Sequence, residues 1–153
     1  MANTYTQIHL HFVIAVKFRQ ALIQPEWKER LYQYITSIIQ HFDHKMLIIN
    51  GMPDHLHFLI GMRPDHSIAN LMQDVKASSS KWINEQKLSN EKFSWQEGYG
   101  AFSYSKSQIP AVIRYIENQE EHHKKRSFKE EYVKILEELH IPYDPKYIFK
   151  DPN

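Results

Sequence analysis

Residues 53–60 read Pro-Asp-His-Leu-His-Phe-Leu-Ile, a turn-like dipeptide followed by an apolar run that carries two histidines. Successive side chains of a β-strand point to opposite faces, so residues two apart share a face. His55 and His57 would therefore point one way, and Leu56 and Phe58 the other. Two neighbouring imidazoles can chelate a divalent metal ion. This stretch predicts a buried strand with a candidate metal site on one face, and that site needs a third ligand from elsewhere.

The elements around this strand follow from hydrophobic patterning. Apolar runs rich in branched and aromatic residues predict strands at 7–18, 45–50, 55–62 and 98–104. Apolar positions at three- and four-residue spacing predict four helices, which begin near Pro25, Ser67, Ser105 and Phe128. The resulting order is the βαββαβ split arrangement of ferredoxin-like domains. We predict an α+β fold with a four-stranded antiparallel sheet, helices on one face, and further C-terminal helices. The first strand and the histidine strand would lie side by side at the centre.

Length and composition limit the class of protein. The 153 residues, 42% of them hydrophobic, suffice for one compact domain, which we place at residues 1–153 with a C-terminal tail at 140–153. The absence of cysteine excludes disulfides, cysteine zinc sites and a cysteine nucleophile. No apolar run of membrane-spanning length and no signal peptide is found, so we expect a cytoplasmic protein without a membrane partner. The net charge of +1 does not by itself indicate nucleic-acid binding.

The predicted third helix can complete the histidine site. Tyr115 and Gln119 are four residues apart, so they share a stripe of that helix, on which His122 also falls. Gln119 can offer a carbonyl oxygen to an oxygen-preferring cation such as Mg²⁺ or Mn²⁺, with Tyr115 beside it. Deprotonating a tyrosine at pH 7 costs roughly 4 kcal/mol, which nearby metal charge lowers. The same metal can polarise a phosphodiester. The implied reaction is attack of the phenol on a DNA phosphate, giving a phosphotyrosine link and a free hydroxyl.

These residues resemble the motifs of a known family. His55-Leu56-His57 resembles the histidine–hydrophobe–histidine (HUH) motif of the single-tyrosine transposases of small insertion sequences and of the related REP-associated tyrosine transposases. Residues 115–119, Tyr-Ile-Glu-Asn-Gln, resemble their Tyr-x-x-x-Gln motif. The resemblance extends over roughly residues 5–132 and includes the segments 17–19, 51–54 and 95–99.

The resemblance implies a metal-dependent transposase that cleaves and rejoins single-stranded DNA. His55, His57 and Gln119 would hold Mg²⁺ or Mn²⁺. Tyr115 would become linked to a 5′ phosphate and leave a 3′ hydroxyl, which can later attack the link and rejoin strands. Family members commonly act as homodimers on hairpin-forming element ends, and in some states the tyrosine helix serves the partner's metal site. The expected location is the bacterial or archaeal cytoplasm, associated with the nucleoid when DNA is bound.

The other histidines and the basic residues supply further candidate contacts. His9-Leu10-His11 repeats the histidine pattern on the first strand, and we predict packing or DNA-contact roles for His9 and His11, leaving open that one approaches the metal. His122 is either an outer or phosphate contact or an exposed helical residue. Single-stranded DNA is held by basic side chains on phosphates and by aromatic rings under bases. The candidates for phosphate contacts are Lys17, Arg19, Lys76, Lys81, Arg114 and Lys125.

Two other functions fit parts of the pattern. A non-catalytic single-stranded nucleic-acid-binding module would use sheet aromatics such as Phe12, Phe58 and Phe102. Its binding would not respond to a chelator, and it would not cleave strands. A metal-dependent hydrolase that activates water would tolerate the loss of Tyr115 but not of His57.

Overall fold

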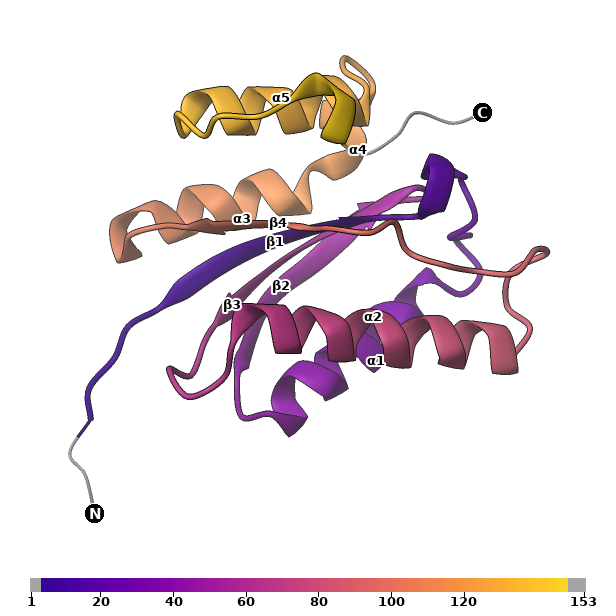
Figure 1. The fold of residues 1–153 in the computed structure, drawn as a ribbon, viewed down its shortest axis with the longest axis horizontal. Coiled ribbons are helices and arrows are strands. Elements are labelled where there is room, and N and C mark those ends of the chain that lie inside the picture. Colours follow the sequence, from indigo (N-terminus) through magenta and orange to yellow (C-terminus); the bar gives the residue numbers. More distant parts are fainter. Residues whose placement is uncertain (1–3, 149–153) are drawn as a thin grey trace.

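The computed structural model describes residues 4–148 and shows a four-stranded antiparallel sheet between two layers of helices (Figure 1). The strands are β1 (His9–Ala15), β2 (Lys45–Met52), β3 (His55–Gly61) and β4 (Gly100–Ser103). Their spatial order is β2-β3-β1-β4, so β1 and β3 are the central pair, as predicted. In the register of this pair Val13 lies opposite His57 and Ala15 lies opposite His55.

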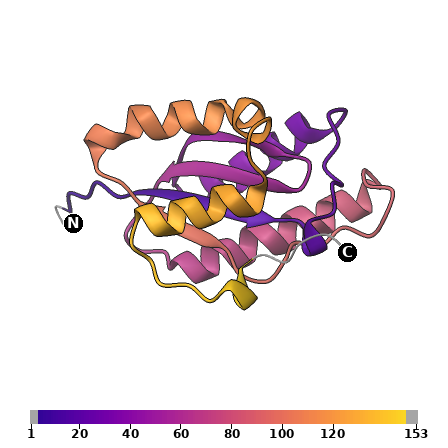
Figure 2. The ribbon, with the colours of Figure 1, turned by 90° about the horizontal axis from the view of Figure 1, so that it is seen from above.

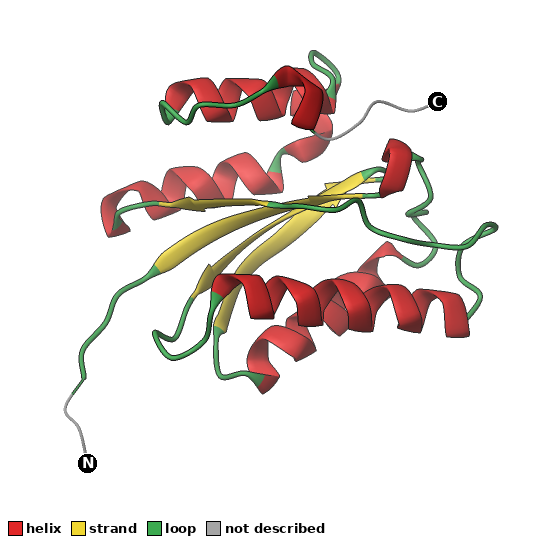
Figure 3. Cartoon of the chain, viewed as in Figure 1, coloured by secondary structure: helices red, strands yellow, loops and turns green. Residues whose placement is uncertain are grey.

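Helices cover both faces of the sheet (Figure 3). One layer consists of α1 (Lys28–His41) and α2 (Ile68–Glu85). The other layer consists of α3 (Ile109–Glu117), α4 (Gln119–His123) and α5 (Phe128–Glu138). Seen from above, α3 and α5 lie side by side over the sheet (Figure 2). The predicted ferredoxin-like α+β fold is confirmed, and the C-terminal helices close its second face.

Several boundaries differ from those predicted. The first strand ends at Ala15 rather than residue 18, because the chain turns into the short 3₁₀ helix η1 (Lys17–Arg19). Two further 3₁₀ helices are η2 (Lys106–Gln108) and η3 (Pro145–Tyr147). The first helix begins at Lys28, three residues after Pro25. Of the predicted tail at 140–153, residues 149–153 lie outside the described part of the chain.

The sheet face toward α1 and α2 forms the main apolar core. Leu56, Phe58 and Ile60 of β3 alternate with the histidines and are fully buried there beside Phe12 and Ile14 of β1. They pack against helix residues that include Leu31, Ile35, Ile39, Leu71, Val75 and Ile83. Each such side chain contributes about 1.5–3 kcal/mol by leaving water. Among the described residues, no helix is both long and apolar enough to cross a bilayer.

The opposite face is buried beneath the C-terminal helices. Val13 and Ala15 pack against α5, and Leu59 packs against α3. His11, His55 and His57 lie on this face and are 0–1% exposed. The C-terminal helices therefore enclose the imidazoles between two small apolar clusters.

A tight hairpin sets the start of β3. Pro53 and Asp54 form a two-residue turn, after which Met52 and His55 pair across the strands. A Cβ added at Gly51 would overlap the carbonyl oxygen of His55, so only glycine allows this close approach. The turn makes His55 the first residue of the strand and directs it toward α5.

The sequence predicts one continuous helix through Tyr115 and Gln119, and this prediction is wrong at Asn118. The helix α3 ends at Glu117, and Asn118 has non-helical dihedral angles of φ −97° and ψ 30°. The side-chain amide of Asn50 on β2 donates to the carbonyl oxygens of Ile116 and Glu117 at 3.0 and 3.1 Å. These bonds satisfy carbonyls that a helix end leaves unpaired. Gln119 consequently opens the separate helix α4 instead of continuing the stripe of Tyr115.

Candidate active site

Two fully buried histidines on β3 form the base of the site. His55 Nδ1 lies 2.7 Å from Asp54 Oδ1, and His57 Nδ1 lies 2.8 Å from Nε2 of His11. Each imidazole therefore has one nitrogen held by a neighbour and directs Nε2 toward the C-terminal helices. Such outer partners fix the orientation of histidines that bind metal. His11, predicted as a packing or DNA-contact residue, is a buried neighbour of His57, whereas His9 is half-buried outside this cluster.

The C-terminal helices bring the predicted glutamine and tyrosine to these histidines. Gln119 is fully buried, and its Oε1 lies 3.2 Å from Nε2 of His55. The ring centroid of Tyr115 lies 5.9 Å from that of His57. The structure thus gathers His55, His57, Gln119 and Tyr115 within one chain, although the break at Asn118 separates the last two into different helices.

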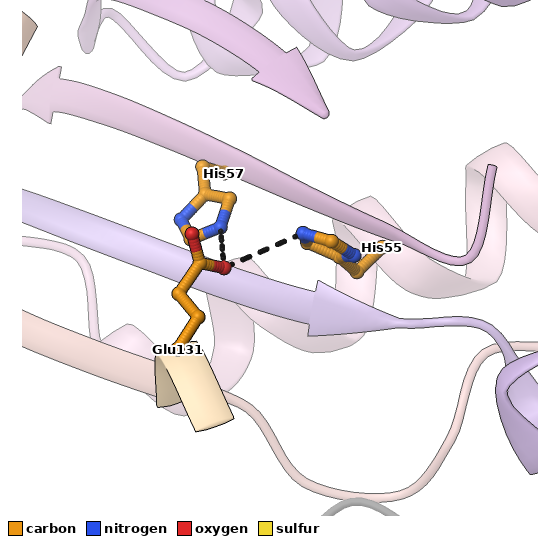
Figure 4. A group of neighbouring side chains, drawn as sticks. All are labelled: His55, His57 and Glu131. Carbon is orange, nitrogen blue, oxygen red and sulfur yellow. Dashed lines mark hydrogen bonds and ion pairs between the residues drawn. The ribbon is translucent and has the colours of Figure 1, made fainter. Parts of the chain in front are cut away.

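Glu131 of α5 lies against His55 and His57 (Figure 4) and also contacts the other two residues of this group. Its Oε1 lies 2.9 Å from Nε2 of His57 and 3.5 Å from Nε2 of His55. Its Oε2 accepts hydrogen bonds from the Tyr115 hydroxyl and, at 3.2 Å, from Nε2 of Gln119. One buried carboxylate therefore contacts all four residues that the sequence singled out.

The electrostatics follow from burial and from this carboxylate. Burial opposes ionisation of Glu131, but the neighbouring histidines outweigh it and hold the pKa of the carboxyl far below its usual value. Burial lowers the pKa of His57, although the Glu131 carboxylate opposes this shift. Burial also opposes a charge on His55, yet hydrogen bonds to Asp54 and Glu131 raise its pKa. Burial and then the Glu131 charge raise the pKa of Tyr115, so its phenol is a protonated donor here.

The donor set fits a divalent metal ion. Ligand atoms of His55, His57 and Glu131 all lie within 4.8 Å of one another, and the three residues are buried. Within residues 4–148 this is the single group of three or more such side chains with that spacing. Imidazole nitrogen and carboxylate oxygen together suit divalent first-row metals. The cluster can therefore hold a metal ion, and its donors leave the choice of ion open.

Two residues at the site, Glu131 and His123, are not predicted from the sequence. Glu131 follows the helix cap Ser127 and shares the buried side of α5 with Phe128, Tyr132 and Ile135. A carboxylate on the apolar side of an amphipathic helix is the sequence signal that could have revealed it, because an unpaired buried charge is costly. The other residue is His123, whose Nε2 lies 3.3 Å from Oε1 of Glu131.

The predicted DNA-contact residues do not form one patch. Arg19 is buried and pairs with Asp54 at 3.6 Å, close to the site. Lys76 donates to the carbonyl oxygens of Gln96 and Gly98. Lys81 lies on α2, in the helix layer opposite the site, 3.8 Å from Glu85. The remaining exposed candidates are Lys17 on η1, Arg114 on α3 and Lys125 after α4.

A cavity lined by charges of both signs adjoins the tyrosine. It has a volume of about 620 Å³ and reaches both Tyr115 and Glu131. Its charged or imidazole-bearing lining consists of the basic or imidazole side chains His122, Lys125, Arg126 and Lys134 and the acidic side chains Glu121, Glu131 and Glu138. The ring of His122 lies 4.5 Å from that of Tyr115, so this residue is a half-buried neighbour of the phenol. Polar groups of both signs therefore border the phenol.

The fold is similar to those of solved transposases. A structure of a REP-associated tyrosine transposase bound to a REP hairpin matches with a TM-score of 0.61 at 12% identity, covering 80% of this chain and 73% of that one. A Deinococcus radiodurans structure described as a transposase matches with a TM-score of 0.62 at 21% identity, covering 78% and 95%. At these identities the likeness concerns the fold alone.

The sequence comparisons show the family. The model of the family described as "Transposase IS200 like" matches residues 4–119, so the chain belongs to this transposase family. The transposase for insertion sequence element IS200 of Salmonella typhimurium is 26% identical over 149 residues, which cover 94% of this chain and 90% of the relative. The ISDra2 transposase TnpA of Deinococcus radiodurans is 22% identical over 118 residues, covering 74% and 84%. Glu131 lies beyond the residues that the family model matches.

Proposed function

We propose that this protein is a metal-dependent transposase that cleaves and rejoins single-stranded DNA through a 5′-phosphotyrosine link at Tyr115. The observation that carries the proposal is the placement of Tyr115 against the buried pair His55 and His57 within one chain. Membership of the IS200-like family supports a role in transposition. The REP hairpin bound by the structural relative supports hairpin-forming single strands as the substrate.

His55, His57 and Gln119 would hold the metal, either Mg²⁺ or Mn²⁺. The bound ion would polarise the phosphodiester and stabilise charge on the leaving oxygen. The protein keeps the two imidazoles in place through Asp54 and His11, which hold their Nδ1 atoms. Burial beneath α5 excludes bulk water from the histidines, which favours transfer to the tyrosine over hydrolysis.

In the first step the phenolic oxygen of Tyr115 forms a bond to phosphorus. The bond between phosphorus and the 3′ oxygen breaks, and that oxygen leaves with the bonding electron pair. The phenol loses one proton and the leaving oxygen gains one, so protons balance in the net reaction. Rejoining is the reverse exchange, in which a 3′ hydroxyl attacks the phosphotyrosine. The covalent link conserves the energy of the cleaved bond.

We propose that the DNA backbone approaches through the cavity beside Tyr115, along its basic side chains. His122, Lys125, Arg126 and Lys134 line it next to Tyr115, and each can contact phosphate oxygens. Of the phosphate contacts predicted from sequence, we retain Lys125 here, together with the exposed Lys17 and Arg114 as outer contacts. Phosphate contacts of this kind weaken steeply with added salt.

A labelling experiment tests the proposal. Single strands carrying the hairpins that flank this protein's gene are incubated with the protein and Mn²⁺ or Mg²⁺, then run on a denaturing gel. DNA labelled at its 3′ end should comigrate with the protein, whereas a 5′ label should appear on a shortened free strand. Tyr115→Phe should abolish the adduct. Tyr104→Phe, which removes another half-buried hydroxyl, should retain it. An adduct that persists in Tyr115→Phe would refute the assignment of the nucleophile.

The partner arrangement is tested in the same assay. We propose a homodimer in which each chain holds its own complete site, because His57, Gln119 and Tyr115 meet within one chain. A mixture of Tyr115→Phe and His57→Ala proteins should then form no adduct. Recovery of the adduct in the mixture would instead show that the tyrosine helix serves the partner's metal site.

The gel also distinguishes the alternative functions. A non-catalytic binding module would need exposed rings on the sheet, but Phe12, Phe58 and Phe102 are 0–4% exposed beneath the two helix layers. This burial disfavours base stacking on the sheet. A hydrolase that activates water would cleave the strand without an adduct and would survive Tyr115→Phe.

A further inference from the structure

Glu131 is a buried acidic residue, and the cost of burying its carboxylate needs an explanation. Its side chain is 3% exposed and lies on α5 between the apolar residues Phe128 and Ile135. Removing a carboxylate from water is costly unless charged or hydrogen-bonding partners compensate. Here five polar side chains surround it: His55, His57, Tyr115, Gln119 and His123.

We propose that Glu131 is a further ligand of the metal site and that its second oxygen positions Tyr115 beside that site. The proposal rests on the metal-dependent function proposed above and adds α5 to the machinery. Residues 4–119, which match the family model, do not include this helix.

The two oxygens of Glu131 face different partners. Oε1 faces the imidazoles, 2.9 Å from His57 Nε2 and 3.5 Å from His55 Nε2. Oε2 faces the hydroxyl of Tyr115 and the amide nitrogen of Gln119. A carboxylate has lone pairs on both oxygens, so one can bind a cation while the other accepts a hydrogen bond. The same side chain can therefore join the metal site to the tyrosine.

The orientation of the Gln119 side-chain amide supports different roles for the two oxygens of Glu131. Its carbonyl oxygen faces His55 at 3.2 Å, while its amide nitrogen donates to Oε2 of Glu131 at 3.2 Å. The amide thus directs its acceptor toward the histidines and its donor toward the carboxylate. Two imidazole nitrogens, one amide oxygen and one carboxylate oxygen would then face the metal. Glu131 is the only member of this set that contributes a negative charge.

The competing explanation is that Glu131 only balances charge on the histidines in the absence of metal and withdraws when a cation binds. In that case neutralising Glu131 would leave metal affinity unchanged or raise it. The ligand role predicts the opposite, because Glu131→Gln replaces a charged carboxylate ligand by a neutral amide and so removes the only negative charge of the set.

A titration of the full chain with Mn²⁺ distinguishes the ligand role from the charge-balancing role. Binding is measured by the loss of the electron paramagnetic resonance signal of free Mn²⁺. Glu131→Gln should weaken binding by at least about 100-fold, at or beyond the upper end for outer partners of metal ligands. Glu130→Gln, a neutralised exposed neighbour on the same helix, should bind within about twofold of the unmodified protein. Equal binding by Glu131→Gln would overturn the ligand role. Failure of the unmodified protein to bind Mn²⁺ would instead refute the proposed metal dependence itself.

A second measurement needs no variant at position 131. In crystals of the unmodified protein grown with Mn²⁺, the anomalous peak should lie within about 2.2 Å of a Glu131 oxygen. A carboxylate turned away from the peak would overturn the proposal even if Glu131→Gln failed to fold.

The positioning role has its own readout. At Mn²⁺ concentrations that saturate Glu131→Gln, the rate of adduct formation should remain about tenfold or more below that of the unmodified protein. Full recovery of the rate at saturating Mn²⁺ would show that Glu131 binds metal without positioning Tyr115.

Discussion

The two faces of β3 are equally buried but have opposite chemistry. On β3, Leu56 and Phe58 face α1 and α2, whereas His55 and His57 face the C-terminal helices, and all four are 0% exposed. The first face excludes water from apolar groups and stabilises the fold. The second encloses imidazoles and the Glu131 carboxylate, whose burial is tolerated because they satisfy one another. Adjacent residues of one strand therefore serve stability and chemistry separately.

The strongest test of this contrast compares two neighbouring residues. His57→Ala should abolish both Mn²⁺ binding and the DNA adduct, because it removes a nitrogen from the proposed metal site. Phe58→Ala should lower the free energy of unfolding by about 3–5 kcal/mol, through lost burial and a cavity. At temperatures where it is folded, Phe58→Ala should still bind Mn²⁺.

Urea unfolding and Mn²⁺ titration measure the two quantities on the same preparations. The separation of the faces would be refuted if Phe58→Ala lost metal binding while fully folded. It would also be refuted if His57→Ala retained the adduct.

A smaller effect on Mn²⁺ affinity is expected at Asp54, which contacts His55 of the proposed metal site. Asp54→Ala removes the acceptor for Nδ1 of His55 and the partner of Arg19. Because outer partners orient metal-bound histidines, Mn²⁺ affinity should fall by about 10–100-fold. Asp65→Ala, at an exposed carboxylate paired with Arg63, is the matched control and should leave the affinity unchanged. An Asp54→Ala protein that binds as tightly as the control would show that the strand alone orients His55.

The smallest effect concerns a second histidine pair that has no carboxylate between its rings. His44 is buried, its Nε2 lies 2.9 Å from Nδ1 of His66, and its Nδ1 accepts from the backbone N–H of Arg63. Burial and the neighbouring His66 lower the pKa of His44. As pH falls through about 6.5, the unfolded chain takes up a proton that the folded His44 resists, so the folded state loses stability.

Urea midpoints between pH 7.5 and 5 check this sign. His44→Gln should make the free energy of unfolding depend less steeply on pH. The slope should change by at most about 1.4 kcal/mol per pH unit, which corresponds to one proton. An unchanged pH dependence in His44→Gln would show that this pair does not contribute to the acid sensitivity.

Much of the fold could be predicted because its signals are local. The alternation around Leu56 and Phe58 and the Ser67 cap report directly on strand faces and a helix start. The break at Asn118 could not be predicted, because it is stabilised by Asn50 on a distant strand. The contacts of Lys76 could not be predicted either, since it donates to backbone carbonyls that only folding brings near.

The sequence by itself determined the βαββαβ order, the shared face of His55 and His57, and the motif that identifies Tyr115 and Gln119 as candidate site residues. Those features depend on spacing within single elements. Only the tertiary structure decided what surrounds the histidines, because Glu131 reaches them from a helix that packs on the sheet more than seventy residues later. A buried charge acquires its partners through packing, and packing is set by the whole fold rather than by the neighbouring sequence.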